Sequence, residues 1–197
     1  MKALLWIGGI VLALLLLVGG SYNGMVGGKN KVVREYAVVQ TQLQARADLV
    51  PNLVATVRGY TNHEERVLVE LTEARAQATR MAQIDPSQIA ANPDLQRQLL
   101  ESQSRLIGAI TVTVEAYPQL QSAQLFGQLQ ATLEGTERRI AVARRDAQIA
   151  VESYNNSIQK LPGVLFAGLF GFEPFDFYEA TAPDAEQVPT VDFSTTP

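Results

Sequence analysis

The sequence predicts an all-α protein in which an N-terminal transmembrane helix precedes an antiparallel bundle of three to four long helices. Three observations support this prediction. The first 20 positions are almost entirely apolar, and no charged residue lies between Lys2 and Lys29. Later stretches repeat apolar residues at steps of three and four, the period of a helix with one buried face. No stretch alternates β-branched and polar residues as a strand would.

The apolar stretch Ala3–Gly20 is long enough to cross a bilayer. At about 1.5 Å per residue it makes a helix of about 27 Å, close to the ~30 Å hydrocarbon core. The alternative is a cleaved signal peptide, but this apolar run exceeds the usual core of about 7–15 residues. We therefore expect a retained anchor whose apolar side chains are Leu4, Leu5, Trp6, Ile7, Ile10, Val11, Leu12, Leu14, Leu15, Leu16, Leu17 and Val18.

Changes in composition divide the chain into five segments. Residues 1–21 form the anchor, and residues 22–30, which contain three glycines, are expected to be a juxtamembrane hinge. The helical bundle is expected over residues 31–162. Residues 163–180 are rich in Phe and are expected to dock on the bundle, with the bilayer or a partner as the alternative. Residues 181–197 are rich in Pro, Thr and Asp, which is typical of a flexible terminus.

Helix signals within the bundle are strong. One apolar seam follows the chain from Lys31 to about Gln83, and Pro51 predicts a kink near Ala47–Val50 or two helices meeting there. A second helix is expected from Leu95 to about Tyr117, and a third from Phe126 to Leu161. Short connections favour antiparallel packing at a coiled-coil-like angle of about 20°.

Composition excludes several functions. A net charge of −4 shows no bias toward nucleic acid, so no nucleic-acid partner is expected. The chain has no Cys and therefore no disulfide, thiol nucleophile or thiolate metal site. No Gly-rich phosphate loop or nucleophile elbow is present. We expect neither enzymatic activity nor a cofactor.

The only histidine, His63, begins an incomplete metal motif. A zinc helix needs a second histidine four residues on, where Val67 stands, so the match fails. A mixed site of His63, Glu64, Glu115 and Glu137 is a minor alternative, because these residue types bind metals in helical bundles.

The block Arg46–Val54, RADLVPNLV, is the most distinctive pattern in the chain. With other pieces before and after it, it resembles the LemA family over nearly the whole sequence. The resemblance implies an N-terminal anchor followed by a long-helix bundle, with no established catalytic activity. The other matching pieces are Tyr22-Asn23, Gly59-Tyr60, His63-Glu64, Ala74-Arg75, Glu115-Ala116-Tyr117-Pro118, Phe126 with Leu129, Thr136-Glu137, Ala143-Arg144-Arg145-Asp146, Tyr154-Asn155 and Phe170-Gly171-Phe172.

Two departures from the family pattern matter. Some LemA proteins resemble lipoproteins, with a cysteine before the Tyr-Asn pair, but here Gly20-Ser21 stands at that point and the helix itself must anchor. Ala147-Gln148 replaces the usual Tyr-Asn pair. Charge counting favours a cytoplasmic bundle, because Lys29, Lys31 and Arg34 follow the anchor. The lipoprotein-like relatives favour the outside, and we expect a single-pass protein of the bacterial inner membrane with an extracytoplasmic bundle.

Polar residues at the matching positions suggest two kinds of site. We interpret one group as a structural network that fixes helix register near Pro51, with a ligand site as the alternative. A second group is interpreted as a solvated or ion-paired face, with lipid phosphate or an acidic partner as the alternative. The first group is Asp48, Asn52, Tyr60, His63, Glu64, Arg75, Glu115 and Glu137; the second is Arg138, Arg139, Arg144 and Arg145.

The function expected from these features is a non-enzymatic, membrane-anchored scaffold or adaptor. Its expected partners are the lipid bilayer, a second copy of the chain and other membrane proteins. Self-association is expected because a tether raises local concentration. The alternative is a ligand- or metal-sensing bundle that uses the cluster around His63 and Glu64.

Overall fold

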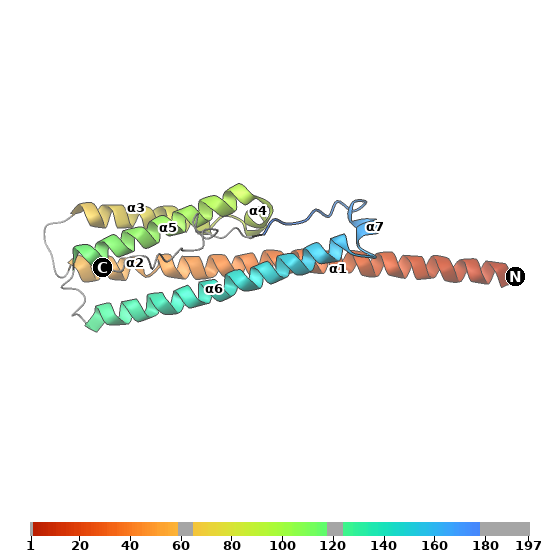
Figure 1. Cartoon of the computed structure of the whole chain (residues 1–197), viewed down its shortest axis with the longest axis horizontal. Coiled ribbons are helices and arrows are strands. Elements are labelled where there is room, and N and C mark those ends of the chain that lie inside the picture. Colours follow the sequence, from red (N-terminus) through yellow and green to blue (C-terminus); the bar gives the residue numbers. More distant parts are fainter. Residues whose placement is uncertain (1, 59–64, 118–123, 178–197) are drawn as a thin grey trace, which may run out of the picture.

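A computed structural model of the chain describes residues 2–58, 65–117 and 124–177. These residues form helices and no strand, so the predicted all-α fold is confirmed. Figure 1 shows one very long helix that extends beyond the others at its N-terminal end. The helices are α1 (Lys2–Ala47), α2 (Val50–Arg58), α3 (Glu65–Ala82), α4 (Pro86–Ala91), α5 (Pro93–Ala116), α6 (Gln124–Gln159) and α7 (Val164–Ala167).

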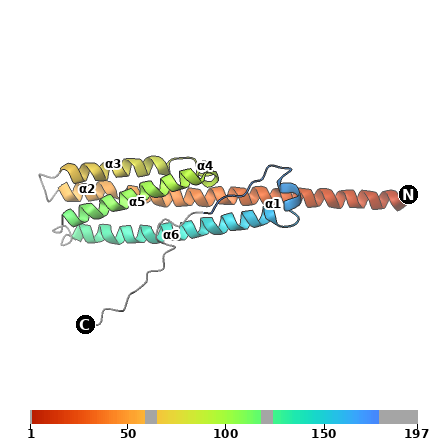
Figure 2. The ribbon, with the colours of Figure 1, turned by 45° about the horizontal axis from the view of Figure 1, so that its top comes forward.

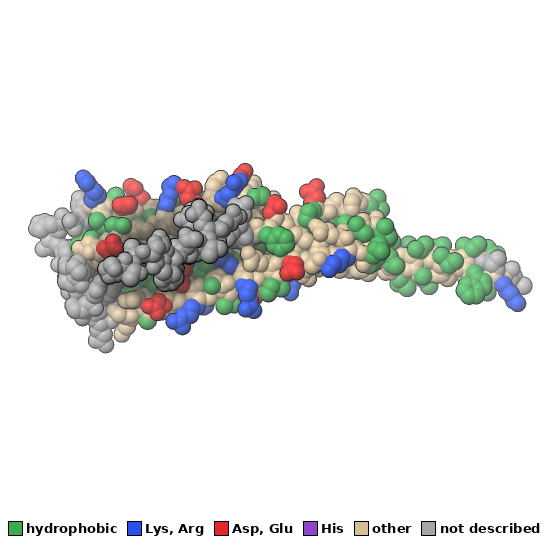
Figure 3. Space-filling model, in the orientation of Figure 1, with side chains coloured by type: hydrophobic (Ala, Val, Ile, Leu, Met, Phe, Trp, Pro, Cys, Tyr) green, Lys and Arg blue, Asp and Glu red, His purple; other side chains and the backbone are tan. Residues whose placement is uncertain are grey.

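The α1 helix has 46 residues and two distinct parts. Residues 4–17 are exposed on every side, and their helix is long and apolar enough to cross a membrane. Farther along the same helix, Met25, Val32, Tyr36, Val39 and Leu43 are buried against other helices. Figure 3 shows the first part as a projecting rod of hydrophobic side chains.

The expected hinge at residues 22–30 is not a break in the structure, because α1 continues through it. Glycine weakens a helix, but tertiary packing can override that preference. Gly28 lies directly against α6: a Cβ added there would be 3.2 Å from Cδ2 of Tyr154. At this position the glycine permits close helix contact rather than bending.

The helix break expected near Pro51 is present. The α1 helix ends at Ala47 and α2 begins at Val50, which puts Pro51 in the first turn of α2. A proline is tolerated there because first-turn N–H groups have no partner within the helix.

The apolar seam expected from Lys31 to about Gln83 is divided among α1, α2 and α3. The chain reverses between α2 and α3, and α3 packs back along α1 (Figure 1). The connection, residues 59–64, lies outside the described residues. Leu53 and Val57 of α2 and Leu71 and Ala78 of α3 join one core cluster, so apolar spacing alone did not distinguish two helices from one.

The second and third predicted helices agree with α5 and α6. The α5 helix begins after Asn92, whose side chain accepts hydrogen bonds from the backbone N–H groups of Asp94 and Leu95. The expected connection before it contains the short α4, capped by Asp85. In Figures 1 and 2, α6 lies along α1 on one side, while α3 and α5 form a second pair.

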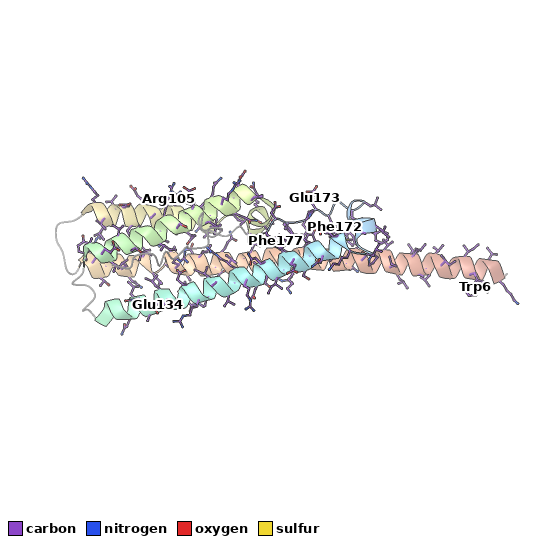
Figure 4. The ribbon with its side chains drawn as sticks, in the orientation of Figure 1. Trp6, Arg105, Glu134, Phe172, Glu173 and Phe177 are labelled. Carbon is purple, nitrogen blue, oxygen red and sulfur yellow. The ribbon has the colours of Figure 1, made fainter. Side chains whose placement is uncertain are left out.

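In the Phe-rich segment, α7 contacts α1 and α6, residues 173–175 bond to α6, and residues 176–177 lie beside the first turns of α5. The Oη of Tyr154 donates to the carbonyl of Glu173 at 3.0 Å. The side chain of Asn155 pairs with the backbone of Phe175 in both directions, at 2.8 and 3.0 Å. Figure 4 shows Phe172 and Glu173 beside α6. The segment is therefore attached to the bundle up to these residues.

Candidate functional site

A buried arginine lies between two hydrophobic clusters of the bundle. The first includes Val39 and Leu43 of α1, and the second is the cluster already described for α2 and α3, which also includes Ala47. Arg46 is only 2% exposed and follows the last α1 residue of the first cluster, Leu43, by one helical turn, while the second cluster begins at Ala47. Its Nη2 donates to Oε2 of Glu137 on α6 at 2.5 Å. Its Nη1 donates to Oε1 of Gln103 on α5 at 3.2 Å. We call Arg46, Gln103 and Glu137 the arginine layer.

The arginine layer restricts how the helices align. A guanidinium is planar and its five N–H donors point in fixed directions, so both acceptors must stay at particular positions along their helices. A shift of α6 by one turn would move Glu137 by about 5.4 Å and break the pair. The layer therefore specifies register between α1, α5 and α6.

The end of α1 is held by a second arginine. In a continuous helix the carbonyl of Ala47 would accept the N–H of residue 51, but that residue is Pro51 and has none. Nε of Arg75 on α3 donates to this carbonyl instead, at 3.0 Å. The proline thus frees a backbone acceptor, and Arg75 uses it to attach α3 to the end of α1.

Asp48 adds a weaker contact at the same place. Its Oδ1 accepts a hydrogen bond from Nε2 of Gln44 at 2.8 Å and lies 3.9 Å from Nη2 of Arg75. The Asp48 side chain is 57% exposed and that of Arg75 36%. Ion pairs this exposed contribute little because water and salt screen them. The backbone contact of Arg75 matters more than its carboxylate contact.

Burial sets the electrostatics of the layer. Desolvation lowers the pKa of the Arg46 guanidinium from its ordinary value, the nearby carboxylate of Glu137 opposes the shift, and Arg144 adds to it. An arginine keeps its proton even so. The buried cation therefore depends on Glu137 for its compensating charge.

The structure brings together only part of the predicted polar network. Glu137 contacts the buried arginine, and Asp48 lies beside Arg75. Asn52 and Glu115 are exposed. Tyr60, His63 and Glu64 lie outside the described residues.

Two members of the arginine layer were missed. Arg46 belongs to the recognised RADLVPNLV block, but the prediction did not assign it to the network. Its position between Leu43 and Val50, at steps of three and four, could have placed it on the buried face. Gln103 likewise lies four residues after Leu99 and three before Leu106, both of which are buried.

The four arginines of α6 do not share one face. Arg138 and Arg145 point outward, with side chains 81% and 76% exposed. Arg139 reaches α1, where its Nε donates to Oε1 of Gln42 at 3.2 Å. Arg144 is half-buried and lies near enough to Arg46 to affect its pKa. An anion-binding face would therefore use the outer pair.

Metal chemistry has no framework in the described part of the chain. Across residues 2–58, 65–117 and 124–177, no three His, Cys, Asp or Glu side chains form a group able to hold an ion. Glu137 is engaged by Arg46, and Glu115 is exposed. The mixed metal site stays a prediction, since His63 and Glu64 lie beyond these residues.

The fold and the site define a class of protein. It is a helical bundle whose first helix continues without a break into an apolar segment long enough to span a membrane, and whose buried polar residues join the helices. A sequence profile of the LemA family matches residues 35–193, which is most of the chain. The chain belongs to the LemA family, and the family resemblance read from the sequence is confirmed.

Individual relatives agree with this assignment. Protein LemA of Metamycoplasma hominis is 22% identical over 192 residues, covering 94% of this chain and 82% of the relative. Magnetosome proteins MamQ 1 and MamQ 2 of Paramagnetospirillum magneticum are each 32% identical over 73 residues. That match covers 37% of this chain and 27% of each magnetosome protein.

Proposed function

We propose that this protein is a non-enzymatic, single-pass membrane scaffold that self-associates and holds a rigid bundle beside the bilayer. Membership of the LemA family suggests a membrane-associated protein without catalytic activity. The observation that carries the proposal is that one helix, α1, is both the apolar segment and a core helix of the bundle.

The exposed part of α1 needs an apolar environment. Eleven large apolar side chains between Leu4 and Leu17 are 44–76% exposed. At about 1.5–3 kcal/mol for each side chain, their transfer from water contributes more than about 15 kcal/mol. That exceeds the whole folding stability of many domains, about 5–15 kcal/mol. Such a surface fits a bilayer better than water.

A structural role suits the polar residues as they lie. Arg46 and Arg75 use their donors to join helices rather than to line a cavity. Binding a substrate through these same donors would require breaking the contacts that join the helices. The contacts favour a rigid spacer over a ligand sensor.

Self-association is supported by glycines at the start of the bundle. Gly20 and Gly24 have the GxxxG spacing that lets membrane helices approach closely. A Cβ added at either position would meet nothing within 4 Å, so their surface of α1 is uncovered. We place the bundle on the extracytoplasmic side of the bacterial inner membrane, following the lipoprotein-like relatives.

Membrane fractionation and sizing test the proposal. The full chain is expected to stay in the membrane after alkaline washing and to form an oligomer in mild detergent. Gly20→Ile with Gly24→Ile should shift the oligomer toward monomer, while Gly8→Ile, remote from the bundle, should leave it unchanged. Release by alkaline washing would refute the anchor, and a monomer at high concentration would refute self-association. Protease digestion of intact cells should remove the bundle only if it lies outside.

A further inference from the structure

A second apolar surface lies at the corner where α6 turns into the Phe-rich segment. Residues 161–170 contain five large apolar side chains that are strongly exposed although the segment is attached to the bundle. Their exposed fractions are 75% for Leu161, 48% for Val164, 66% for Leu165, 78% for Leu169 and 40% for Phe170. Single exposed apolar residues are ordinary, but a cluster of five within ten residues indicates a contact surface. We call residues 161–170 the collar.

The collar lies at the level where the apolar part of α1 ends. The ring of Tyr22 packs edge-on against Phe170 at 5.1 Å and against Phe172 at 5.7 Å, measured between ring centroids. Tyr22 follows Gly20 by only two residues, about 3 Å along the helix. Figure 1 shows α7 beside α1, close to the part that projects from the bundle.

The continuity of α1 fixes this position. Because the helix has no break from Lys2 to Ala47, the collar cannot move away from the end of the apolar segment without bending a helix or losing the Tyr22 contacts. If α1 crosses a bilayer, the collar must therefore lie at the headgroup level of that bilayer. The apolar surfaces of α1 and the collar are then one continuous contact with lipid.

The composition of the collar suits an interface. Residues 161–172 contain no charged side chain, and the residue before them is the exposed Lys160. Phe and Leu are the apolar residues with which interfacial segments enter the boundary between headgroups and acyl chains, and a flanking lysine favours anionic lipid. We favour lipid over a second copy of the chain as the partner of the collar, because a bilayer crossed by α1 would already lie next to it.

We propose that the collar inserts into the headgroup region of the leaflet from which α1 emerges, forming a second membrane contact. The inference rests on the proposed membrane anchoring. With two contacts, the helix and the collar beside it, the bundle is held at one tilt and one rotation relative to the bilayer. A single helix would leave it free to turn.

Tryptophan quenching tests the collar with the full chain. The protein has one Trp, Trp6, inside the anchor. Leu165→Trp in a Trp6→Phe background reports on the collar, and Val142→Trp in the same background is the control. Val142 is 56% exposed on α6, about 25 Å along the helix from its membrane-side end. The unaltered protein, which reports from Trp6, and the two variants are each placed in phosphatidylcholine–phosphatidylglycerol nanodiscs with one chain per disc. Emission is compared with and without lipids brominated near the glycerol end of the acyl chains.

The expected result is loss of emission from Trp6 and from Leu165→Trp, with a blue shift for the latter, and no change for Val142→Trp. Circular dichroism confirms that each variant is helical. If Trp6 is quenched and Leu165→Trp behaves like Val142→Trp, the collar proposal is overturned and the anchor stands. If Trp6 is not quenched, the anchor itself fails. If the emission of Leu165→Trp shifts to the blue only when two chains share a disc, a second copy of the chain covers the collar and the proposed lipid contact is wrong.

Discussion

Removing Glu137 should destabilise the bundle more than removing Arg46, although the two residues form one ion pair. Glu137→Gln leaves the Arg46 cation 2% exposed and without its carboxylate. Arg46→Met leaves the carboxylate of Glu137, which is 47% exposed and can be hydrated. The asymmetry of burial therefore predicts an asymmetry of stability.

The magnitude follows from the cost of a buried charge. Breaking a fully buried pair by removing one partner costs about 3–5 kcal/mol. Water reaches the Glu137 side of this pair, so we expect about 2 kcal/mol for Glu137→Gln. For Arg46→Met we expect about 1 kcal/mol. The desolvated cation is gone and the Glu137 carboxylate can be hydrated, but Oε1 of the buried Gln103 loses its donor. In a chain of this size, 2 kcal/mol lowers Tm by about 4–8 °C.

Thermal unfolding of the full chain in detergent, followed by circular dichroism, measures both variants. Glu134→Gln is a matched control one turn earlier on α6, because its side chain is 57% exposed and lies 3.8 Å from that of Arg138. Its removal should cost less than about 0.5 kcal/mol. Equal losses for Glu137→Gln and Glu134→Gln, or a larger loss for Arg46→Met, would refute the reasoning.

Three further predictions follow from single contacts. Arg75→Met leaves the carbonyl at the end of α1 without its side-chain donor and should cost about 1–3 kcal/mol in a denaturant titration; no change would show that the contact is dispensable. Gly27 faces open space, so Gly27→Ala should stabilise the chain by about 1 kcal/mol through its higher helix propensity. Gly28→Ala should lose that gain because the added methyl group would press on the buried ring of Tyr154. Equal Tm values for the two variants would contradict this packing. Burial, and then Glu173, raises the pKa of Tyr154 above its ordinary 10.0. Above about pH 10 the unfolded state therefore loses a proton that the native state keeps, and the free energy of unfolding should fall as pH rises. The fall should be less steep for Tyr154→Phe. Identical pH profiles for this variant and the unaltered protein would exclude Tyr154 as the cause.

The long helices could be predicted because their signals are local. Asn92 and Pro93 mark the start of α5, and three- and four-residue spacing marks the buried faces of α5 and α6. The break near Pro51 was predictable for the same reason, since a missing N–H is a property of one residue. At these positions local chemistry determines where a helix starts or stops.

The reversal after α2 and the arginine layer depended on distant contacts. The amphipathic spacing of α2 and α3 continues in phase whether or not the chain turns back. The glycines at residues 22–30 indicated flexibility, but Gly28 is packed against a ring more than a hundred residues away in the sequence. The partner of Arg46 was equally hidden, because Glu137 is on another helix. Such pairings require the three-dimensional arrangement.

Residues 46–51 connect the fold to the proposed function. Arg46 joins α1 to α5 and α6, and Pro51 releases the Ala47 carbonyl that joins α1 to α3, so all four long helices are aligned within one turn of the chain. This point lies about 39 Å along α1 from Gly20, and the end of α2 about 57 Å, at 1.5 Å per residue. A scaffold aligned this way presents its far end at a set height above the bilayer. A partner bound at that end must itself extend about as far from the membrane.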